Sequence, residues 1–471
     1  MKRIISFFVA VFIFLCPMNN AFAISIPEEN ELAKKFMKMV KDNNMILNDP
    51  AANHLVNQVG RHLLSVLPPQ PFNYSFYIVD DDIFNAFASP SANIFVYRGL
   101  ITALDSVDEL AGIIAHEIAH ASSRHVSESI DRAKYINLGS LAGLLAGVII
   151  GSQSGGDAGT AVIGSSMAVG QTAMLAFTRE NETEADEKGI MYLKKSCFSP
   201  RGLLSGLMKI RAADFKGIEN IPDYVKTHPG TGNRIAHTEL ILSEQGDDKD
   251  KPPCPATFQF DMVKHRLLGL YSDIEPALNK LTTQLENEPS NPAMNYGIGL
   301  IYDRKLMREK ALFHLRKALS VDPFNPLIRI EMGRIYLESK ETQKAFNMLQ
   351  DIESDPVLGL LAKSYLGSAY LELGNLEKAK ISFLQIIEKE PVLYPKAYYH
   401  LANILSQEKN PGLSHYYLGV YYEKTATPKT AKIHLRKALE KLKDPGDIEK
   451  AKTLLDKLEK EFPQNNAVPR I

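Results

Sequence analysis

The chain has 471 residues, which is enough for two or three domains. Its 54 Lys and Arg residues nearly balance 55 Asp and Glu residues, so the formal net charge is −1, and 45% of the residues are hydrophobic. This balance argues against a nucleic-acid partner and provides no general attraction to anionic membranes. The composition is otherwise that of an ordinary globular protein.

The N-terminus has the pattern of a secretory signal peptide. Two basic residues precede an apolar run from Ile4 to Leu15, and Ala21-Phe22-Ala23 supplies a small-x-small cleavage site. We expect residues 1–23 to be a signal peptide that is cleaved after Ala23. The mature protein is then expected in a bacterial periplasm, and an uncleaved membrane anchor is the alternative.

Helices and then a small sheet are expected to open the mature chain. Residues 27–66 read as helical with a short break near 48–50. Alternating aromatic and β-branched residues predict strands at 73–79, 85–88 and 93–97. We expect the last of these to be an edge strand that holds a substrate backbone by strand addition. That prediction covers Asn93, Ile94, Phe95 and Val96.

The run His116-Glu117-Ile118-Ala119-His120 is an HExxH motif in a stretch that is expected to be helical. Ser106 offers an N-cap for this helix, and Glu109 would complete a capping box. Residues four apart share one face of a helix, so the two imidazoles can bind one Zn²⁺ while Glu117 acts as general base toward a water. Because HExxH also occurs by chance, the zinc prediction depends on a third ligand.

Two patterns could supply that third ligand. The metzincin pattern requires Gly at 123 and His at 126, but the chain has Ser123 and Val126, so it fails. His125 is out of helical phase with the histidine pair and is expected to be a structural or surface residue.

A glutamate on a second helix is the other solution. Glu182 and Asp186 are four residues apart and therefore share a helical face. Glu182 can bind the zinc, and Asp186 can accept the N–H of a liganding imidazole and fix its tautomer. An acidic, solvated helix face is the alternative for this segment.

Two apolar or small-residue runs lie between the motif and Glu182, within residues 138–177. Neither reaches the length of strongly apolar sequence that is needed to span a bilayer. Buried helices of the catalytic domain are the favoured interpretation, and a hairpin that contacts a membrane peripherally remains open.

From about residue 258 the chain repeats with a period of 34 residues, the signature of tetratricopeptide helix pairs. The positions in register are Gly299, Gly333 and Gly367; Tyr302, Tyr336 and Tyr370; and Ala311, Ala345 and Ala379. Gly419, Tyr422 and Ala431 repeat the pattern after a longer interval, which an extra helix near 396–407 would fill. Such solenoids bind peptides or partner proteins.

Two cysteines remain after signal cleavage, Cys197 and Cys254. They could form a disulfide in an oxidising compartment, and a loop of that length contributes about 4 kcal/mol on the chain-entropy model. The proline-rich segment around Cys254 favours this pairing, because such a segment benefits from a tether. Two buried free thiols remain the alternative.

The motif HEIAH, followed by RENETEAD at Arg179–Asp186, resembles the gluzincin peptidase family that includes the HtpX heat-shock protease and the CAAX prenyl protease. Asn85-Ala86-Phe87-Ala88 is similar to that family's strand before the motif helix, although Ser91-Ala92 stands where the family usually has Gly-Gly. With an export signal and C-terminal repeats, nearly the whole mature chain resembles periplasmic proteases with chaperone activity.

The resemblance also assigns roles within Thr227–Ile235, which matches the family's HPxxxxRI element. It implies that His228 lies on a loop over the active site, where it can occupy the fourth zinc position and keep the enzyme latent. It also implies that Arg234 contributes to catalysis by stabilising the substrate carbonyl, or else stabilises the loop. From the residues alone, His228 is only a histidine in a flexible Gly-Pro loop.

The predicted fold is therefore mainly α. An α+β gluzincin metallopeptidase domain with a small sheet is expected over residues 24–250, followed by an all-α tetratricopeptide-repeat solenoid over 258–462.

The predicted function is that of an exported endopeptidase with one Zn²⁺ per chain and chaperone activity. Its expected substrates are unfolded or misassembled envelope proteins, and its repeats are expected to bind the outer-membrane protein assembly machinery, at the periphery of that membrane. One alternative is a periplasmic adaptor with a latent protease site. Another is a membrane-embedded protease, which would require spanning segments that are not evident.

Overall fold

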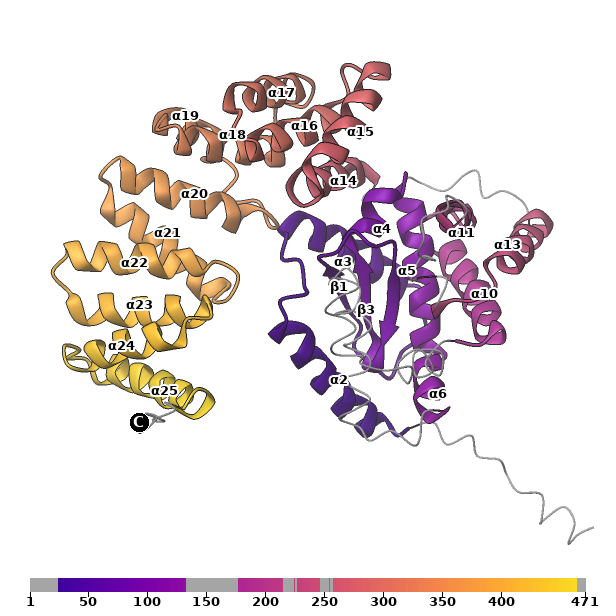
Figure 1. Ribbon diagram of the computed structural model, residues 1–471, viewed down its shortest axis with the longest axis horizontal. Helices are drawn as coiled ribbons and strands as arrows, with labels where there is room; N and C mark the ends of the chain where they lie inside the picture. The colour runs from indigo at the N-terminus through magenta and orange to yellow at the C-terminus, as the bar shows by residue number, and fades with distance from the viewer. Residues whose placement is uncertain are drawn as a thin grey trace, which may run out of the picture. The chain divides into compact units, whose positions relative to one another are not determined.

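The computed structural model describes residues 24–132, 177–214, 224, 227–245, 254 and 257–463 (Figure 1). The chain divides into two compact units. The first comprises the residues up to Leu47 together with Leu55–Phe260, and the second comprises Asn48–His54 and the residues from Asp261 onward. The predicted signal peptide and almost all of 138–177 lie outside the described residues.

Up to residue 245 the elements are α2 (Ile26–Asp42), α3 (Pro50–Leu64), β1 (Ser75–Val79), β2 (Ala86–Ser89), the 3-10 turn η1 (Pro90–Ala92), β3 (Asn93–Tyr97), α4 (Arg98–Ala103), α5 (Val107–Ser122), α6 (His125–Arg132), α10 (Arg179–Lys195), α11 (Arg201–Asp214) and α13 (Thr231–Gln245). This confirms the predicted succession of helices, three short strands and the motif helix. The strand boundaries differ from the prediction by one or two residues.

From residue 257 the elements are all helices: α14 (Thr257–Tyr271), α15 (Ile274–Asn287), α16 (Pro292–Arg304), α17 (Arg308–Val321), α18 (Pro326–Glu338), α19 (Thr342–Leu349), α20 (Gly359–Glu372), α21 (Leu376–Lys389), α22 (Pro395–Gln407), α23 (Pro411–Lys424), α24 (Pro428–Leu439) and α25 (Pro445–Glu461). The mainly helical fold with one small sheet is thus confirmed. None of the described helices is both long and apolar enough to cross a membrane.

The sheet has the strand order β1-β3-β2, with β1 parallel and β2 antiparallel to β3. The prediction that Asn93, Ile94, Phe95 and Val96 form an edge strand is therefore wrong, because β3 is paired on both sides. All five residues of β3 are buried. The outer strands among the described residues are β1 and β2, and β2 packs against α5, the helix that carries the HExxH motif.

Aromatic side chains hold the sheet against α2. Phe95 of β3 stacks between Tyr77 and Phe87 of the outer strands, with ring centroids 5.2 and 4.9 Å apart. Phe36 of α2 meets Phe95 edge-on at 5.6 Å. These rings form a buried cluster with Tyr97 and neighbouring aliphatic side chains, so α2 is fixed to the same sheet that packs beside the motif helix.

The 34-residue register of the repeats has a simple packing cause. A Cβ atom added to Gly299 would lie 2.8 Å from Leu315, the residue 16 positions later on the partner helix. Equivalent contacts of 2.7 or 2.8 Å would arise at Gly333, Gly367 and Gly419, against Leu349, Phe383 and Leu435. Only glycine permits this close helix–helix approach, so each repeat requires glycine at the same place.

Cys197 and Cys254 form a disulfide, with their Cα atoms 5.4 Å apart. The separation lies within the normal range for such a bond, and the pairing favoured from the sequence is present. Cys254 is buried, and the bond connects the segment after α10 to a residue 57 positions later. It therefore closes a loop that contains α11 and α13.

Candidate metal centre

The HExxH motif lies on α5, a helix that is almost entirely buried. The Ser106 hydroxyl accepts the backbone N–H of Glu109 and caps its N-terminus. The expected reciprocal bond differs in detail, because the Glu109 carboxylate accepts the N–H of Asp105 instead of Ser106. Gly112 lets α11 approach closely, since a Cβ there would lie 2.4 Å from the backbone nitrogen of Leu203.

Four side chains from three segments converge on one point. The Nε2 atoms of His116 and His120 lie 3.0 Å apart, and Glu182 of α10 places its oxygens 3.4 and 3.3 Å from them. His228 adds its Nδ1 atom, which is 3.0 Å from Glu182 Oε1 and 3.4 Å from His116 Nε2. All four side chains are fully buried, and their candidate ligand atoms all lie within 4.8 Å of one another.

Asp186 lies behind His116, one turn after Glu182 on α10. Its Oδ1 atom is 2.8 Å from His116 Nδ1, so the carboxylate can accept that N–H and aim Nε2 into the cluster. Arg234 of α13 binds the same carboxylate through two nitrogens, each at 2.8 Å, and its third nitrogen lies 2.7 Å from Glu182. The guanidinium is thus held by two carboxylates of α10.

His125 supports the motif through a contact that the sequence did not predict. Its helical phase suggested a structural or surface residue; it is buried, and its Nδ1 atom lies 3.0 Å from His120 Nδ1. Its other nitrogen is 3.2 Å from the Glu184 carboxylate. The left-handed conformation of Arg124, with φ 59°, turns the chain so that His125 faces back toward the motif. No pattern in the sequence signals that turn.

Two aromatic rings cover the imidazoles. Phe177 stacks on His120 with centroids 3.9 Å apart, and Tyr224 stacks on His228 at 4.3 Å. The Tyr224 carbonyl also accepts the backbone N–H of His228 at 2.8 Å. The two rings pack over His120 and His228, and the stacking of Tyr224 helps to hold His228 beside Glu182.

The buried charges shift one another's pKa values strongly. Burial and Arg234 lower the pKa of His116, but Asp186 and Glu182 outweigh both and raise it to about 9. Burial raises the pKa of Asp186, but Arg234 and His116 outweigh it and lower the value to about 2. Burial raises the pKa of Glu117. A proton on His116 and a metal compete for the same nitrogen, so metal affinity should fall in acid.

The donor set fits Zn²⁺. Two imidazoles and a carboxylate are the ligands of zinc peptidases, and the two carboxyl oxygens of Glu117 are buried without a hydrogen-bond partner among the described residues. His228 Nε2 is likewise unpartnered and lies 3.6 Å from Glu117 Oε1. Unpaired buried carboxylate oxygens are costly, so their presence beside three ligand atoms indicates a bound cation and water.

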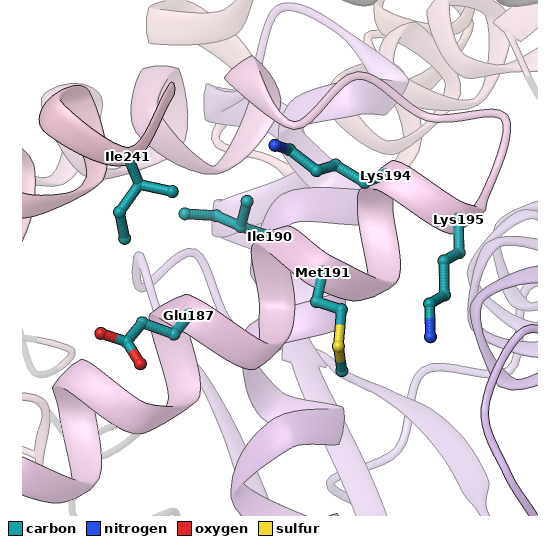
Figure 2. A pocket seen from close by; sticks show the side chains of 6 residues that line it. All are labelled: Glu187, Ile190, Met191, Lys194, Lys195 and Ile241. Atoms are coloured by element: carbon teal, nitrogen blue, oxygen red, sulfur yellow. The ribbon is translucent and has the colours of Figure 1, made fainter. Parts of the chain in front are cut away.

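An open pocket elsewhere on this unit has a different character. It has a volume of about 500 Å³, and Figure 2 shows the side chains that line it. They come from α10 and α13: Glu187, Ile190, Met191, Lys194, Lys195 and Ile241. None of the converging ligands lines this pocket, and we assign no chemistry to it.

The class of the catalytic domain follows from comparison with known families. Residues 50–241 match peptidase family M48, and residues 366–391 match the tetratricopeptide repeat. The chain is therefore similar to metallopeptidases of family M48 over residues 50–241 and to tetratricopeptide repeats further along, as the resemblance implied.

Several relatives are identical to this chain at about a quarter of the aligned positions. The beta-barrel assembly-enhancing protease of Escherichia coli K12 is 26% identical over 265 residues, which are 56% of this chain and 53% of that protein. The protein of the same name from Yersinia pestis is 25% identical over 289 residues, or 61% and 57% of the two chains. The human mitochondrial metalloendopeptidase OMA1 is 25% identical over 220 residues, or 45% and 41%.

The matches to the bacterial relatives span little more than half of those proteins' length. Among solved structures, that of PilW, a type IV pilus biogenesis factor, covers 44% of this chain and 93% of its own, at 19% identity and a TM-score of 0.33. A likeness at this level does not establish a shared fold.

Proposed function

We propose that the chain is a zinc endopeptidase that binds one Zn²⁺ through His116, His120 and Glu182. The observation that carries the proposal is the Glu117 carboxylate, buried and unpartnered beside the converging ligand atoms. When bound, the metal would supply a Lewis acid that polarises the scissile carbonyl. Membership of the domain in a metallopeptidase family supports the same conclusion.

The chain's own residues have distinct parts in this reaction. Glu117 takes the proton of the attacking water and passes it to the leaving amine. Its burial raises its pKa, so the carboxylate accepts the proton of the water more readily. Asp186 holds the orientation of His116, and Arg234 balances the charge of Asp186 and Glu182.

His228 keeps the site latent in this proposal. Its ring lies between the ligand cluster and Glu117, with one nitrogen directed to each. A substrate carbonyl and an attacking water need that same space. His228 therefore has to move before cleavage, which would restrict the enzyme to conditions or partners that displace it.

The substrate backbone would be held on β2 instead of β3. Within the described part of the sheet, β2 pairs on one side only, and it packs along α5 beside the motif. An extended peptide can add to such an edge through backbone hydrogen bonds. This places the strand Ala86–Ser89 in the role that was expected of Asn93–Val96.

The biological setting that we propose is quality control or assembly of outer-membrane proteins in the periplasm. The predicted signal peptide supports it, as does the name of the bacterial relatives, beta-barrel assembly-enhancing protease. Unfolded or misassembled envelope proteins are then the substrates, and the repeats bind the assembly machinery. Contact of residues 138–177 with a membrane belongs to the same proposal, and osmotic-shock fractionation tests the location.

The decisive variant for catalysis is Glu117→Gln. It keeps every proposed ligand and removes the base, so zinc content should stay at one per chain while cleavage of reduced casein falls at least a hundredfold or so. Glu180→Gln on the exposed start of α10 is the matched control and should cleave normally. Full activity of Glu117→Gln would refute the assignment of the base.

A second candidate function is that of an adaptor whose repeats matter more than its peptidase. The repeat unit with its regular 34-residue register supports this alternative. If Glu117→Gln restores normal envelope assembly in a deletion strain, binding is the main activity. If only the parent restores it, cleavage is required.

A further inference from the structure

Glu29 on α2 is a buried carboxylate that the proposed chemistry does not use. It is 3% exposed, although it lies on the first turn of an otherwise amphipathic helix. Its Oε1 atom accepts the backbone N–H of Ser91 at 3.0 Å. Its Oε2 atom accepts from Arg124 at 3.0 Å and from the Ser127 hydroxyl at 2.7 Å. One side chain thus connects α2 to two separate segments.

The first of these segments is the turn η1, which has an unusual backbone. Ser91 and Ala92 both adopt left-handed conformations, with φ values of 59° and 58°. Residues with a Cβ atom rarely hold this conformation unless neighbours fix it, and two in succession are rarer still. Here Glu29 binds the Ser91 N–H, and the Ser91 hydroxyl donates to Asn30 Oδ1 at 2.6 Å. Helix α2 therefore supplies the contacts that fix the turn.

The second segment directly follows the motif helix. Arg124 is also left-handed, with φ 59°, and it comes directly before His125, which contacts His120. The Arg124 guanidinium binds both Glu29 and the Ile24 carbonyl, at 3.0 and 2.6 Å. Ser127 follows on α6. The same carboxylate therefore contacts the turn after β2 and the turn after α5.

These contacts link the proposed substrate-binding strand β2 to the motif helix α5. Strand β2 ends at Ser89, and η1 packs against both α2 and α5. A displacement of the turn would shift the edge of β2 relative to the motif helix. A misplacement of about 1 Å in a catalytic arrangement can cost around a hundredfold in rate.

We propose that Glu29 is a positioning residue of the peptidase, which aligns the substrate-binding edge of β2 with the motif helix by fixing the left-handed Ser91-Ala92 turn. This inference rests on the proposed function for its effect on cleavage. The tie itself, by which we mean the contacts of Glu29 that join α2 to η1 and to the residues after α5, does not depend on any activity. The turn needs such contacts because positions 91 and 92 are Ser and Ala, which adopt the left-handed conformation less readily than glycine.

The test uses Glu29→Gln in the full chain, which preserves the size of the side chain and removes its charge. Glu31→Gln is the matched control, because Glu31 lies on the same helix, is exposed and pairs only with Lys34 in the structure. We expect Glu29→Gln to raise KM for reduced casein about tenfold, with zinc content unchanged, and Glu31→Gln to leave KM as in the parent.

Rescue separates positioning from general damage. Glycine adopts the left-handed conformation without help, so adding Ser91→Gly and Ala92→Gly to Glu29→Gln should return KM to within about twofold of the parent. An unchanged KM in Glu29→Gln overturns the proposal. So does a raised KM that the glycines do not restore.

Amide hydrogen exchange keeps this result distinct from failure of the proposed function. If neither the parent nor His228→Ala cleaves reduced casein, the proposed function fails, but the contacts of Glu29 can still be measured. Glu29→Gln should then speed exchange in residues 89–93 and 124–127 at least about tenfold, and Glu31→Gln should not. Equal protection in both variants would overturn the inference whatever the activity.

Discussion

At the scale of single residues, each liganding imidazole is held from behind by a different partner. His116 Nδ1 lies 2.8 Å from Asp186 Oδ1, and His120 Nδ1 lies 3.0 Å from His125 Nδ1. Such contacts fix the tautomer and the ring orientation, and they raise the basicity of the ligand. The two histidines of one motif therefore depend on two different supports, one on α10 and one after α5.

His125→Ala should weaken zinc binding about 10- to 100-fold, because His120 loses the contact that orients its ring. The measurement is competition for zinc with a chelator of known affinity. His237→Ala, which removes an exposed histidine paired with Glu187, is the control and should bind zinc as the parent does. Unchanged affinity in His125→Ala would mean that His120 is oriented without it.

His228→Ala should increase cleavage of reduced casein. If the imidazole covers the site most of the time, its removal should raise the rate about tenfold or more. Zinc content should stay near one per chain, because His116, His120 and Glu182 remain. A variant that keeps its zinc but cleaves no faster than the parent would contradict the proposed latency.

The sequence predicted part of this arrangement and not the rest, for physical reasons. The spacing of His116, His120, Glu182 and Asp186 follows from helical geometry, so these residues could be found from their positions alone. His125 and Glu29 could not, because both act through left-handed turns at non-glycine residues. Local sequence carries little signal for such turns.

At the scale of elements, strand order is where sequence reasoning failed. The alternation of residues identified each strand, but three strands can be ordered in several ways, and β3 lies in the middle. Complete burial of both faces of β3 is the feature that distinguishes it from an edge strand. That burial depends on α2, which lies about fifty residues earlier in the chain, and on α5, which follows the sheet.

The repeats contain a recurring polar arrangement that differs between two copies. In the earlier copy, His314 stacks on Tyr302 and its Nδ1 atom lies 3.0 Å from Asn295 Oδ1. In the later copy, His434 stacks on Tyr422, and its Nδ1 atom lies 3.1 Å from the Nδ1 atom of His415. A histidine thus replaces an asparagine at the same register.

The histidine pair should make the α23–α24 contact sensitive to pH. Burial and nearby lysines lower the pKa of both histidines, although Glu440 acts in the opposite direction on His415. Because the folded-state pKa values lie below the unfolded value, the stabilising contribution is present above about pH 6.5 and is lost as the pH falls below it. Two protonated rings would also repel each other.

Hydrogen exchange of α23 and α24 at pH 7.5 and 5.5, corrected for intrinsic rates, measures this effect. The parent should lose protection at the lower pH. His415→Asn, which recreates the arrangement of Asn295 with His314, should lose less. Equal losses in the two proteins would show that the pair does not titrate in this range.

At the scale of the whole molecule, the chain combines a domain that matches a metallopeptidase family with a series of helical repeats. The 34-residue period and the HExxH motif could be read directly, because a period and a helical spacing are local properties. The boundary after Phe260 became visible only from how residues pack within each unit. The proposed latency could not be read from the sequence in the same way, because it depends on contacts between His228 and residues more than a hundred positions earlier in the chain.

The measurement that tests the account most directly is zinc-edge anomalous scattering from crystals of the full chain. We expect one strong peak about 2.0–2.2 Å from the ligand atoms of His116, His120 and Glu182. Zinc bound elsewhere, or a peak that these three side chains do not share, would contradict the account.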